Sequence, residues 1–343
     1  MASVSSPQIK SAAATGSPAK TGVLLCNLGT PEAPTAPAVR RYLAQFLSDP
    51  RVVALPRLLW LPILYGFILP FRPAKSAAKY ASIWMAEGSP LAHWTQRQAL
   101  LLRGFLGERK LPATVLHAMR YGQPSIARQL DALVADGCGR ILVLPLYPQY
   151  SSTTTESITD AVNAWAARRP GGAQLRSVRD YHGDAGFIEA WVKRVRGYWQ
   201  VHGRPDKLVM SFHGVPVNTI ARGDSYEREC QETARRLGER LGWAPGDYLV
   251  TFQSRFGKAK WLEPATEPTL RELGRAGTGR VDVVCPGFPC DCLETLEEIA
   301  MEGKAAFLES GGREFHHIPC LNDSDAWIGA LASLVEQNTA GWR

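Results

Sequence analysis

The chain has 343 residues, of which 45% are hydrophobic and 21% are charged, and its formal net charge is +7 at pH 7. This composition excludes an intrinsically disordered protein, and the length allows two hydrophobic cores. The positive charge suits an anionic ligand or an anionic membrane surface; no stretch alternates basic and aromatic residues, so we expect no nucleic-acid partner.

The first twenty residues are rich in Ala and Ser and contain no acid. They lack the apolar centre of a secretory signal, so we expect residues 1–20 to form a flexible arm. The seven cysteines are an odd number and are widely spread. This pattern is typical of reduced thiols in an intracellular protein, and we expect a cytoplasmic location.

Six short apolar runs have the composition of buried strands: 22–26, 114–118, 140–144, 207–211, 248–252 and 281–285. The polar segments between them are long enough for helices. Alternation of strands and helices predicts an α/β fold with parallel sheets covered by helices on both faces.

The ends of these strands repeat in the same order. The matching pairs are 27–31 with 212–216, 120–122 with 255–257, and 145–148 with 286–289. We therefore expect a duplicated unit with two similar lobes, the first over residues 21–170 and the second over 171–322, followed by a C-terminal helix over 323–343. The first lobe carries about fifty additional residues between its first two matched sites. Ligands bind beyond the carboxyl ends of parallel strands, so the cleft should lie where these sites meet.

Residues 58–71 lie in this insertion and contain no charge, while Arg57 precedes them and Arg72 follows. The run is too short to span a bilayer and contains two prolines. It is either a lip that dips into a membrane surface, with Leu61, Ile63 and Leu64 on the lipid side, or part of a buried core.

The loop 147–155 combines two aromatic residues with five hydroxyls. Such a loop binds carboxylate or phosphate groups at a helix start, or simply caps the helix.

His213 directly follows a predicted strand and precedes Gly214. The matching position in the first lobe is Leu28, so the turn itself does not require an imidazole. A histidine at this position either accepts protons or binds a metal, or it is a structural residue.

Glu294, Glu298 and Glu302 recur at intervals of four residues, which places them on one face of a predicted helix. Such a row of acids can guide cations or protons into a cleft. Alternatively, Asp291 and Glu294 have the spacing of a helix capping box.

Cys285, Cys290 and Cys292, with Cys320, are candidate ligands of a metal or an iron–sulfur cluster. Their spacing lacks the common pair separated by two residues, and Cys285 belongs to an apolar run. We expect core thiols and no cluster.

Together these segments resemble ferrochelatase from about Thr21 to the final helix. The resemblance is carried by 27–31 (NLGTP), 88–90 (GSP), 119–122 (MRYG), 147–151 (YPQYS), 211–216 (SFHGVP), 222–226 (RGDSY), 253–255 (QSR), 261–262 (WL) and 291–296 (DCLETL).

The resemblance implies two Rossmann-like lobes of the chelatase type with the active-site cleft between them. It implies an enzyme that inserts Fe²⁺ into protoporphyrin IX to give protohaem, the last step of haem biosynthesis. By motif match, His213 and Glu294 are the catalytic pair and the metal ligands, and Glu298 is an accessory acid. The positions that match porphyrin-binding residues are Arg72, Ser89, Arg120, Tyr121, Tyr147, Trp261, Phe288 and Asp291. Which of His213 and Glu294 delivers iron, and which accepts protons, is left open.

Fe²⁺ and the porphyrin are then substrates, and we expect no tightly bound cofactor. Some ferrochelatases hold a [2Fe–2S] cluster through cysteines in a C-terminal extension, and this sequence stops at Arg343 without one. We expect peripheral contact with the inner membrane surface. Two other functions fit the residue types: a chelatase for another metal such as cobalt, and a two-lobed carrier of haem or porphyrin.

Overall fold

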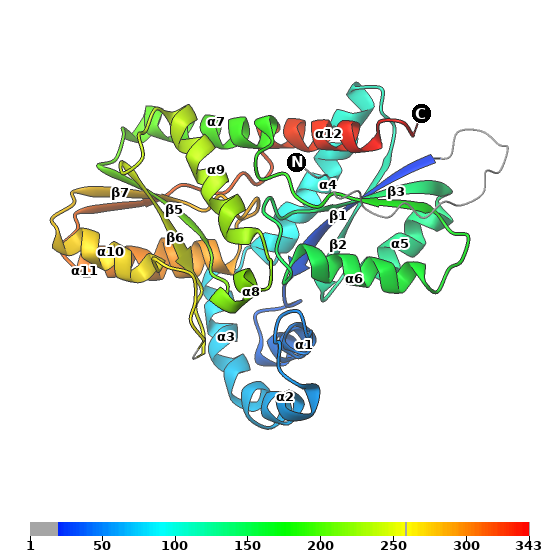
Figure 1. Ribbon diagram of the computed structural model, residues 1–343, viewed down its shortest axis with the longest axis horizontal. Coiled ribbons are helices and arrows are strands. Elements are labelled where there is room, and N and C mark those ends of the chain that lie inside the picture. The colour runs from blue at the N-terminus through cyan, green and yellow to red at the C-terminus, as the bar shows by residue number, and fades with distance from the viewer. Residues whose placement is uncertain (1–19, 258, 343) are drawn as a thin grey trace.

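A computed structural model describes residues 20–257 and 259–342. Two four-stranded parallel sheets lie side by side with helices on both faces (Figure 1). The expected N-terminal arm, apart from Lys20, lies outside the described residues. Of the described helices, none is long and apolar enough to cross a membrane.

Both sheets have the same strand order. The first is ordered β2-β1-β3-β4 and the second β6-β5-β7-β8, with every neighbouring pair parallel. The strands are β1 (Lys20–Gly29), β2 (Thr114–Tyr121), β3 (Cys138–Pro145), β4 (Gln174–Ser177), β5 (Lys207–His213), β6 (Tyr248–Gln253), β7 (Arg280–Val284) and β8 (Glu314–His317). The common topology confirms the two similar lobes expected from the repeated strand ends.

The helices of the first half are α1 (Ala36–Leu47), α2 (Arg57–Ile63), the π-helix η1 (Leu64–Ile68), α3 (Leu69–Ile83), α4 (Pro90–Glu108), α5 (Ile126–Ala135), α6 (Thr155–Ala166) and α7 (Ala185–His202). Those of the second half are α8 (Val217–Ala221), α9 (Tyr226–Leu241), α10 (Thr266–Arg275), the π-helix η2 (Glu294–Gly303), α11 (Lys304–Glu309) and α12 (Asp325–Thr339).

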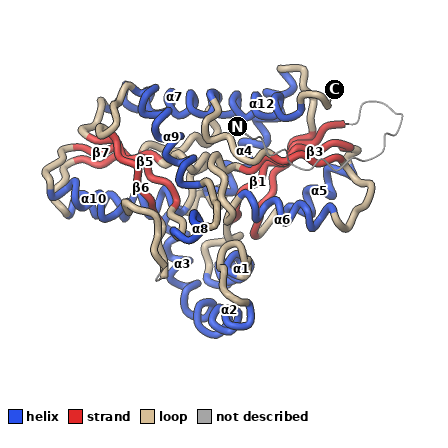
Figure 2. Tube along the Cα trace, viewed as in Figure 1, coloured by secondary structure: helices blue, strands red, loops and turns tan. Residues whose placement is uncertain are grey.

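The segment from α1 to α3 is the insertion of the first lobe. In Figures 1 and 2 it projects below the two sheets, and it has its own small core, which includes Val39, Leu43, Leu64 and Leu69. Leu64 is fully buried in this core, so the expectation that it faces lipid is wrong. Leu61 is partly buried, and Ile63 is exposed.

The helices that follow the last strand of each sheet exchange lobes. α7 follows β4 but packs on α9 in the second lobe, whereas α12 follows β8 but packs on α4 in the first (Figure 1). Trp191 of α7 and Trp327 of α12 belong to one continuous core that includes residues of both lobes. Because β4 pairs with β3, a boundary drawn by sheet membership falls after Ser177 rather than at residue 170.

Candidate active site

His213 is the last residue of β5 and is half-buried. Its Nδ1 lies 2.6 Å from the carbonyl oxygen of Gly214, and its ring centre is 6.4 Å from that of Phe288. A Cβ atom at Gly214 would lie 2.7 Å from the carbonyl oxygen of Gln253. The turn after His213 therefore needs a glycine, because the ends of β5 and β6 approach so closely.

Glu294 is the first residue of η2 and is also half-buried. Burial raises the pKa values of Tyr42, Tyr80 and Tyr147 well above the usual range, and the charge of Glu294 raises each of them further. Glu294 therefore lies within electrostatic reach of tyrosines that belong to the first lobe and its insertion.

The hydrogen bonds around the start of η2 differ from those of a capping box. The N-terminal cap of η2 makes no side-chain hydrogen bond. The carboxylate of Asp291 accepts from Thr295 Oγ1 at 2.9 Å and from Asn322 Nδ2 at 2.7 Å. It thus fixes the loop that precedes Glu294, and Asp291 is 5% exposed.

Glu298 lies close to both His213 and Glu294. Burial raises its pKa, while hydrogen bonds from Ser254 and the charge of His213 oppose the rise and the charge of Glu294 adds to it. Ser254 donates its backbone N–H to Oε1 at 2.6 Å and its hydroxyl to Oε2. One imidazole at the end of β5 and two carboxyl groups of η2 therefore lie within electrostatic reach of one another, a set that can bind a cation and transfer protons.

The third acid of the predicted row, Glu302, is engaged elsewhere. Lys79 of α3 lies 2.8 Å from Glu302 and 2.8 Å from Glu297, so it ties the insertion to η2. Burial raises the pKa of Glu297 in spite of this lysine.

Gln253 joins the turn beside His213 to the start of η2. Its Nε2 donates to the carbonyl of Glu294 at 2.8 Å, and its Oε1 accepts from Ser211 at 2.7 Å. Its backbone carbonyl accepts from Gly214 N at 2.7 Å. Gln253 was not predicted as a site residue, although 253–255 carries part of the family resemblance and Gln253 ends the strand next to that of His213.

Two expected porphyrin-binding residues, Trp261 and Phe288, lie beside His213. If Gly214 carried a Cβ atom, that atom would lie 3.3 Å from a ring atom of Trp261, so the indole packs against the turn that follows His213. Arg72 of α3 holds its guanidinium 6.0 Å from the centre of the Phe256 ring, which in turn packs against Trp261.

The expected residues of the first lobe form another group. Tyr121 donates to Asp49 at 2.7 Å, and Arg120 also donates to Asp49 at 2.7 Å. The Tyr147 hydroxyl is buried and makes no hydrogen bond to the described residues. Ser89 shares a hydrogen bond of 2.7 Å with Thr30. The polar groups of Arg120, Tyr121 and Ser89 are thus bonded within the first lobe. Sequence reasoning also missed Tyr42, whose charge raises the pKa of Tyr147, and Tyr80, which interacts with Tyr42.

All seven cysteines are buried and free. Burial raises the thiol pKa of Cys285, Cys292 and Cys320 well above the usual range, and that of Cys290 to about 12. Within residues 20–257 and 259–342, the one close group of three potential metal-ligating side chains is Asp180, His182 and Glu229.

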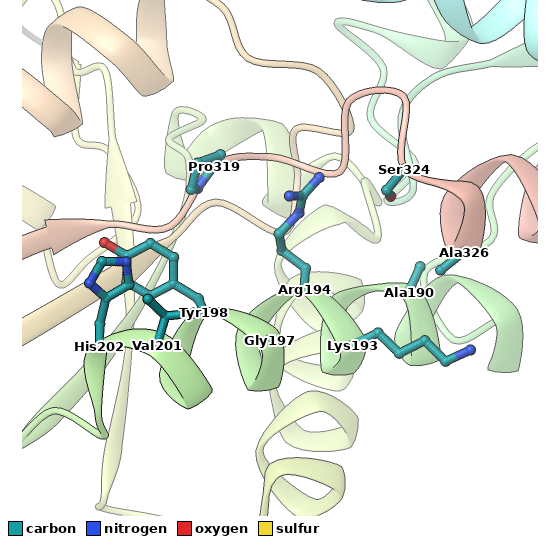
Figure 3. Close-up of a pocket in the computed structure, with 10 residues that line it drawn as sticks. All are labelled: Ala190, Lys193, Arg194, Gly197, Tyr198, Val201, His202, Pro319, Ser324 and Ala326. Carbon is teal, nitrogen blue, oxygen red and sulfur yellow. The ribbon is translucent and has the colours of Figure 1, made fainter.

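Two surface hollows lie away from His213, Glu294 and Glu298. One of 410 Å³ lies between α7 and the segment from β8 to α12, where Arg194, Tyr198 and His202 line it (Figure 3). The other, of 260 Å³, is lined by residues of α7, by Arg204 and by Leu241. The candidate site is therefore identified by the ionisable side chains of His213, Glu294 and Glu298 and by their position in the second lobe, and not by a hollow in the surface.

Comparison with known proteins gives a consistent result. A family model described as Ferrochelatase matches residues 20–339. The ferrochelatase of Polaromonas sp. (strain JS666) is 63% identical over 322 residues, which are 94% of this chain and 88% of that protein. The ferrochelatase of Methylibium petroleiphilum is 61% identical over 327 residues, 95% of this chain and 90% of the relative.

The fold also has solved counterparts. The structure of SirB from Bacillus subtilis with Fe³⁺ matches with a TM-score of 0.55 and 14% sequence identity, over 94% of this chain and 96% of that one. At this identity the likeness concerns the fold, and it confirms the two-lobed chelatase architecture.

Proposed function

This chain belongs to the ferrochelatase family, whose activity is the insertion of iron into a porphyrin for haem synthesis, and from this premise we propose that His213 and Glu294 act directly on the iron and the pyrrole protons. The observation that carries this assignment is that the charges of His213 and Glu294 both act on the carboxyl group of Glu298, so an imidazole at the end of β5 and two carboxyl groups of η2 lie within electrostatic reach of one another. Iron and porphyrin are both substrates, and protoporphyrin IX is the porphyrin that we propose.

The tautomer of His213 follows from its hydrogen bond. A neutral imidazole that donates from Nδ1 to the Gly214 carbonyl keeps the lone pair of Nε2 free. This lone pair can bind ferrous iron or accept a pyrrole proton. The Glu294 carboxylate can replace water ligands of the iron, because carboxylate and imidazole both suit ferrous iron.

The aromatic residues supply the rigid surroundings that metal insertion needs. A planar porphyrin hides its nitrogen lone pairs from an incoming ion, so holding the ring in a puckered shape exposes them. Trp261 and Phe288 line the side of His213, while Tyr121 and Tyr147 come from the first lobe. We propose that the porphyrin lies between these two groups, with Arg72, Ser89, Arg120 and Asp291 around it.

A steady-state assay under anaerobic conditions tests this function. With Fe²⁺ and an excess of protoporphyrin IX, an enzyme forms many equivalents of haem per protein molecule. A carrier instead binds a stoichiometric amount of porphyrin and forms no further product. Parallel assays with Co²⁺ and Zn²⁺ measure metal preference. Turnover that is much faster with Co²⁺ than with Fe²⁺ would favour a cobalt chelatase.

We further propose that the insertion is the contact with the cytoplasmic face of a membrane. Leu58 is 91% exposed, Phe71 is 75% exposed and Phe67 is 69% exposed, although all three are large and apolar. Arg57 and Lys75 are exposed near this surface. An apolar surface with a basic border binds anionic lipid by burial and by charge.

We also propose that the enzyme has no resident metal or iron–sulfur cluster. The positions of Cys285, Cys290, Cys292 and Cys320 support this, because among the described residues these thiols do not converge into a close group of three or more metal ligands.

A further inference from the structure

The segment 222–226, which carries part of the family resemblance, connects α8 to the start of α9. Asp224 of this segment accepts a hydrogen bond from the backbone N–H of Ser152 at 2.7 Å and another from the Ser151 hydroxyl at 3.2 Å. Ser151 and Ser152 belong to the first lobe, in the loop that follows β3. Asp224 is 9% exposed, so it joins the two lobes through a nearly buried carboxylate.

A second carboxylate, Glu229, makes a similar bond one turn along α9. It accepts the backbone N–H of Tyr150 at 2.7 Å and is 1% exposed. Arg179, which follows β4 of the first lobe, lies 3.2 Å from Glu229 and stacks over the Tyr150 ring at 4.0 Å. A buried carboxylate needs such partners, because an unpaired buried charge is costly.

The same loop touches the second lobe at a third point. Gln149 donates to Thr233 of α9 at 2.9 Å, and both side chains are buried. The Oε1 atom of Gln149 also lies 3.4 Å from where a Cβ of Gly287 would be. Gly287 immediately precedes Phe288, so the first-lobe loop lies against the turn that carries this aromatic residue.

The start of α9 is connected to the proposed catalytic histidine as well. The Tyr226 hydroxyl lies within reach of the His213 backbone, which lowers its pKa while burial raises it overall, and Tyr226 is buried, with 7% exposure. α9 thus contacts the end of β5 on one side and the first-lobe loop on the other. That loop begins at Tyr147, whose hydroxyl lies within the electrostatic reach of Glu294.

We propose that Asp224 and Glu229 form an interlobe clasp that holds loop 147–152 of the first lobe against the second lobe and so sets the spacing between Tyr147 and His213. They are positioning residues that act through Tyr150, Ser151 and Ser152. This inference rests on the proposed function, because the spacing matters if the porphyrin is bound and deformed between these two walls.

The acceptor atoms of Glu229 are already in use, so a metal site made of Asp180, His182 and Glu229 does not explain this arrangement. Tyr150 N, the Ser225 hydroxyl and Arg179 all contact the Glu229 carboxylate. His182 Nδ1 is 2.9 Å from Asp180. Arg179 thus supplies the positive charge that this buried acid requires.

The test uses the full chain with two conservative substitutions, Asp224→Asn and Glu229→Gln. Each keeps the size of the side chain but replaces one of its two acceptor oxygens with an amide NH₂ group, which cannot accept a hydrogen bond. Both oxygens of each carboxylate are engaged, Asp224 Oδ1 by Tyr226 N and Oδ2 by Ser152 N, and Glu229 Oε1 by Ser225 and Oε2 by Tyr150 N, so each variant loses at least one of these bonds or its charge. The matched control is Glu232→Gln on the same helix, whose carboxylate pairs with Arg235 and Arg236 within α9. For all four proteins we would measure kcat, the KM values for Fe²⁺ and porphyrin, the melting temperature, and the resonance Raman out-of-plane bands of bound protoporphyrin.

The clasp predicts that kcat falls by about 10- to 100-fold in both variants, because small misplacements of reacting groups are costly. The porphyrin out-of-plane bands should weaken in parallel, while the KM for Fe²⁺ and all properties of the control stay near wild type. If the acid variants do not fold, Ser151→Ala serves in their place. It removes one hydrogen bond to Asp224 but leaves the buried charge of Asp224 intact, and it should change kcat and the porphyrin bands in the same direction by a smaller amount.

Two results would contradict the proposed clasp. In the first, the variants keep the kcat and the porphyrin bands of the wild type, even if their melting temperature is lower. In the second, kcat falls but the porphyrin bands do not change. Failure of the proposed function is a separate outcome, because wild-type protein itself would then show no multiple turnover.

Discussion

The side-chain amide of Gln253 donates a hydrogen bond of 2.8 Å to the backbone carbonyl of Glu294. The backbone carbonyl of the same glutamine accepts from Gly214 N at 2.7 Å, next to His213. One buried residue at the end of β6 therefore fixes the positions of both proposed catalytic residues, although they are far apart in the sequence.

Replacing Gln253 with Leu should reduce kcat by roughly tenfold or more, because His213 and Glu294 lose their shared support. The loss of buried partners for Ser211 and Glu294 should also cost about 1–3 kcal/mol of unfolding free energy. Gln129→Leu is the matched control, since Gln129 donates a similar bond to the His117 carbonyl in the first lobe. Equal kcat values in the two variants would argue against a positioning role.

Glu298→Gln should slow turnover by roughly tenfold, about 1.4 kcal/mol in activation free energy, and less than the loss of Glu294. Glu298 accepts two hydrogen bonds from Ser254, so the amide can keep one of them. The measurement is kcat at saturating Fe²⁺ and porphyrin. If the variant were as inactive as Glu294→Ala, Glu298 would be a direct participant.

Replacing both Leu58 and Phe71 with serine should weaken binding to anionic vesicles by at least about tenfold. The reason is that burying one such side chain in the membrane surface contributes about 1.5–3 kcal/mol to binding. Co-sedimentation with vesicles at low and high salt measures this, and higher salt should weaken binding further. Leu100→Ser is a matched control, since Leu100 is 60% exposed on α4, outside the insertion. Unchanged binding in the double variant would contradict the membrane contact.

His317 should make the protein less stable in mild acid. Burial lowers its pKa, and the charge of Asp291 opposes this only in part. The stability gained from neutral His317 is present above the unfolded pKa of about 6.5 and is lost as the pH falls through the lower folded pKa. The melting temperature should therefore fall less between about pH 7.5 and about pH 5.5 in His317→Gln than in wild type. Equal slopes would show that His317 does not contribute.

The sequence predicts the duplicated α/β fold well, because the six main strands are apolar runs followed by repeated turns. It does not reveal β4 and β8, whose four-residue sequences QLRS and EFHH are short and largely polar. The sequence also does not predict that α7 and α12 exchange lobes. An amphipathic pattern indicates that a helix packs against a core, but it does not indicate which lobe provides that core.

The candidate site divides in the same way. His213 is detectable because it places an ionisable group at the end of an apolar strand, and Glu294 because it begins a row of acids at intervals of four residues. Gln253 and Glu229 are not, since their roles depend on hydrogen bonds to distant backbone atoms. The sequence places the insertion between the first two matched sites, as the structure confirms, but it does not separate the buried Leu64 from the exposed Leu58.

The most direct test of the catalytic assignment is to measure kcat and melting temperature on the same Glu294→Ala protein, with His213→Ala in parallel. We predict that both variants bind porphyrin and melt near the wild-type temperature but fail to insert iron, because the lost groups act on the reacting centre. A helix-capping role for Glu294 predicts the reverse, a loss of about 1 kcal/mol in stability with normal kcat. A destabilised Glu294→Ala protein with full activity would contradict the assignment.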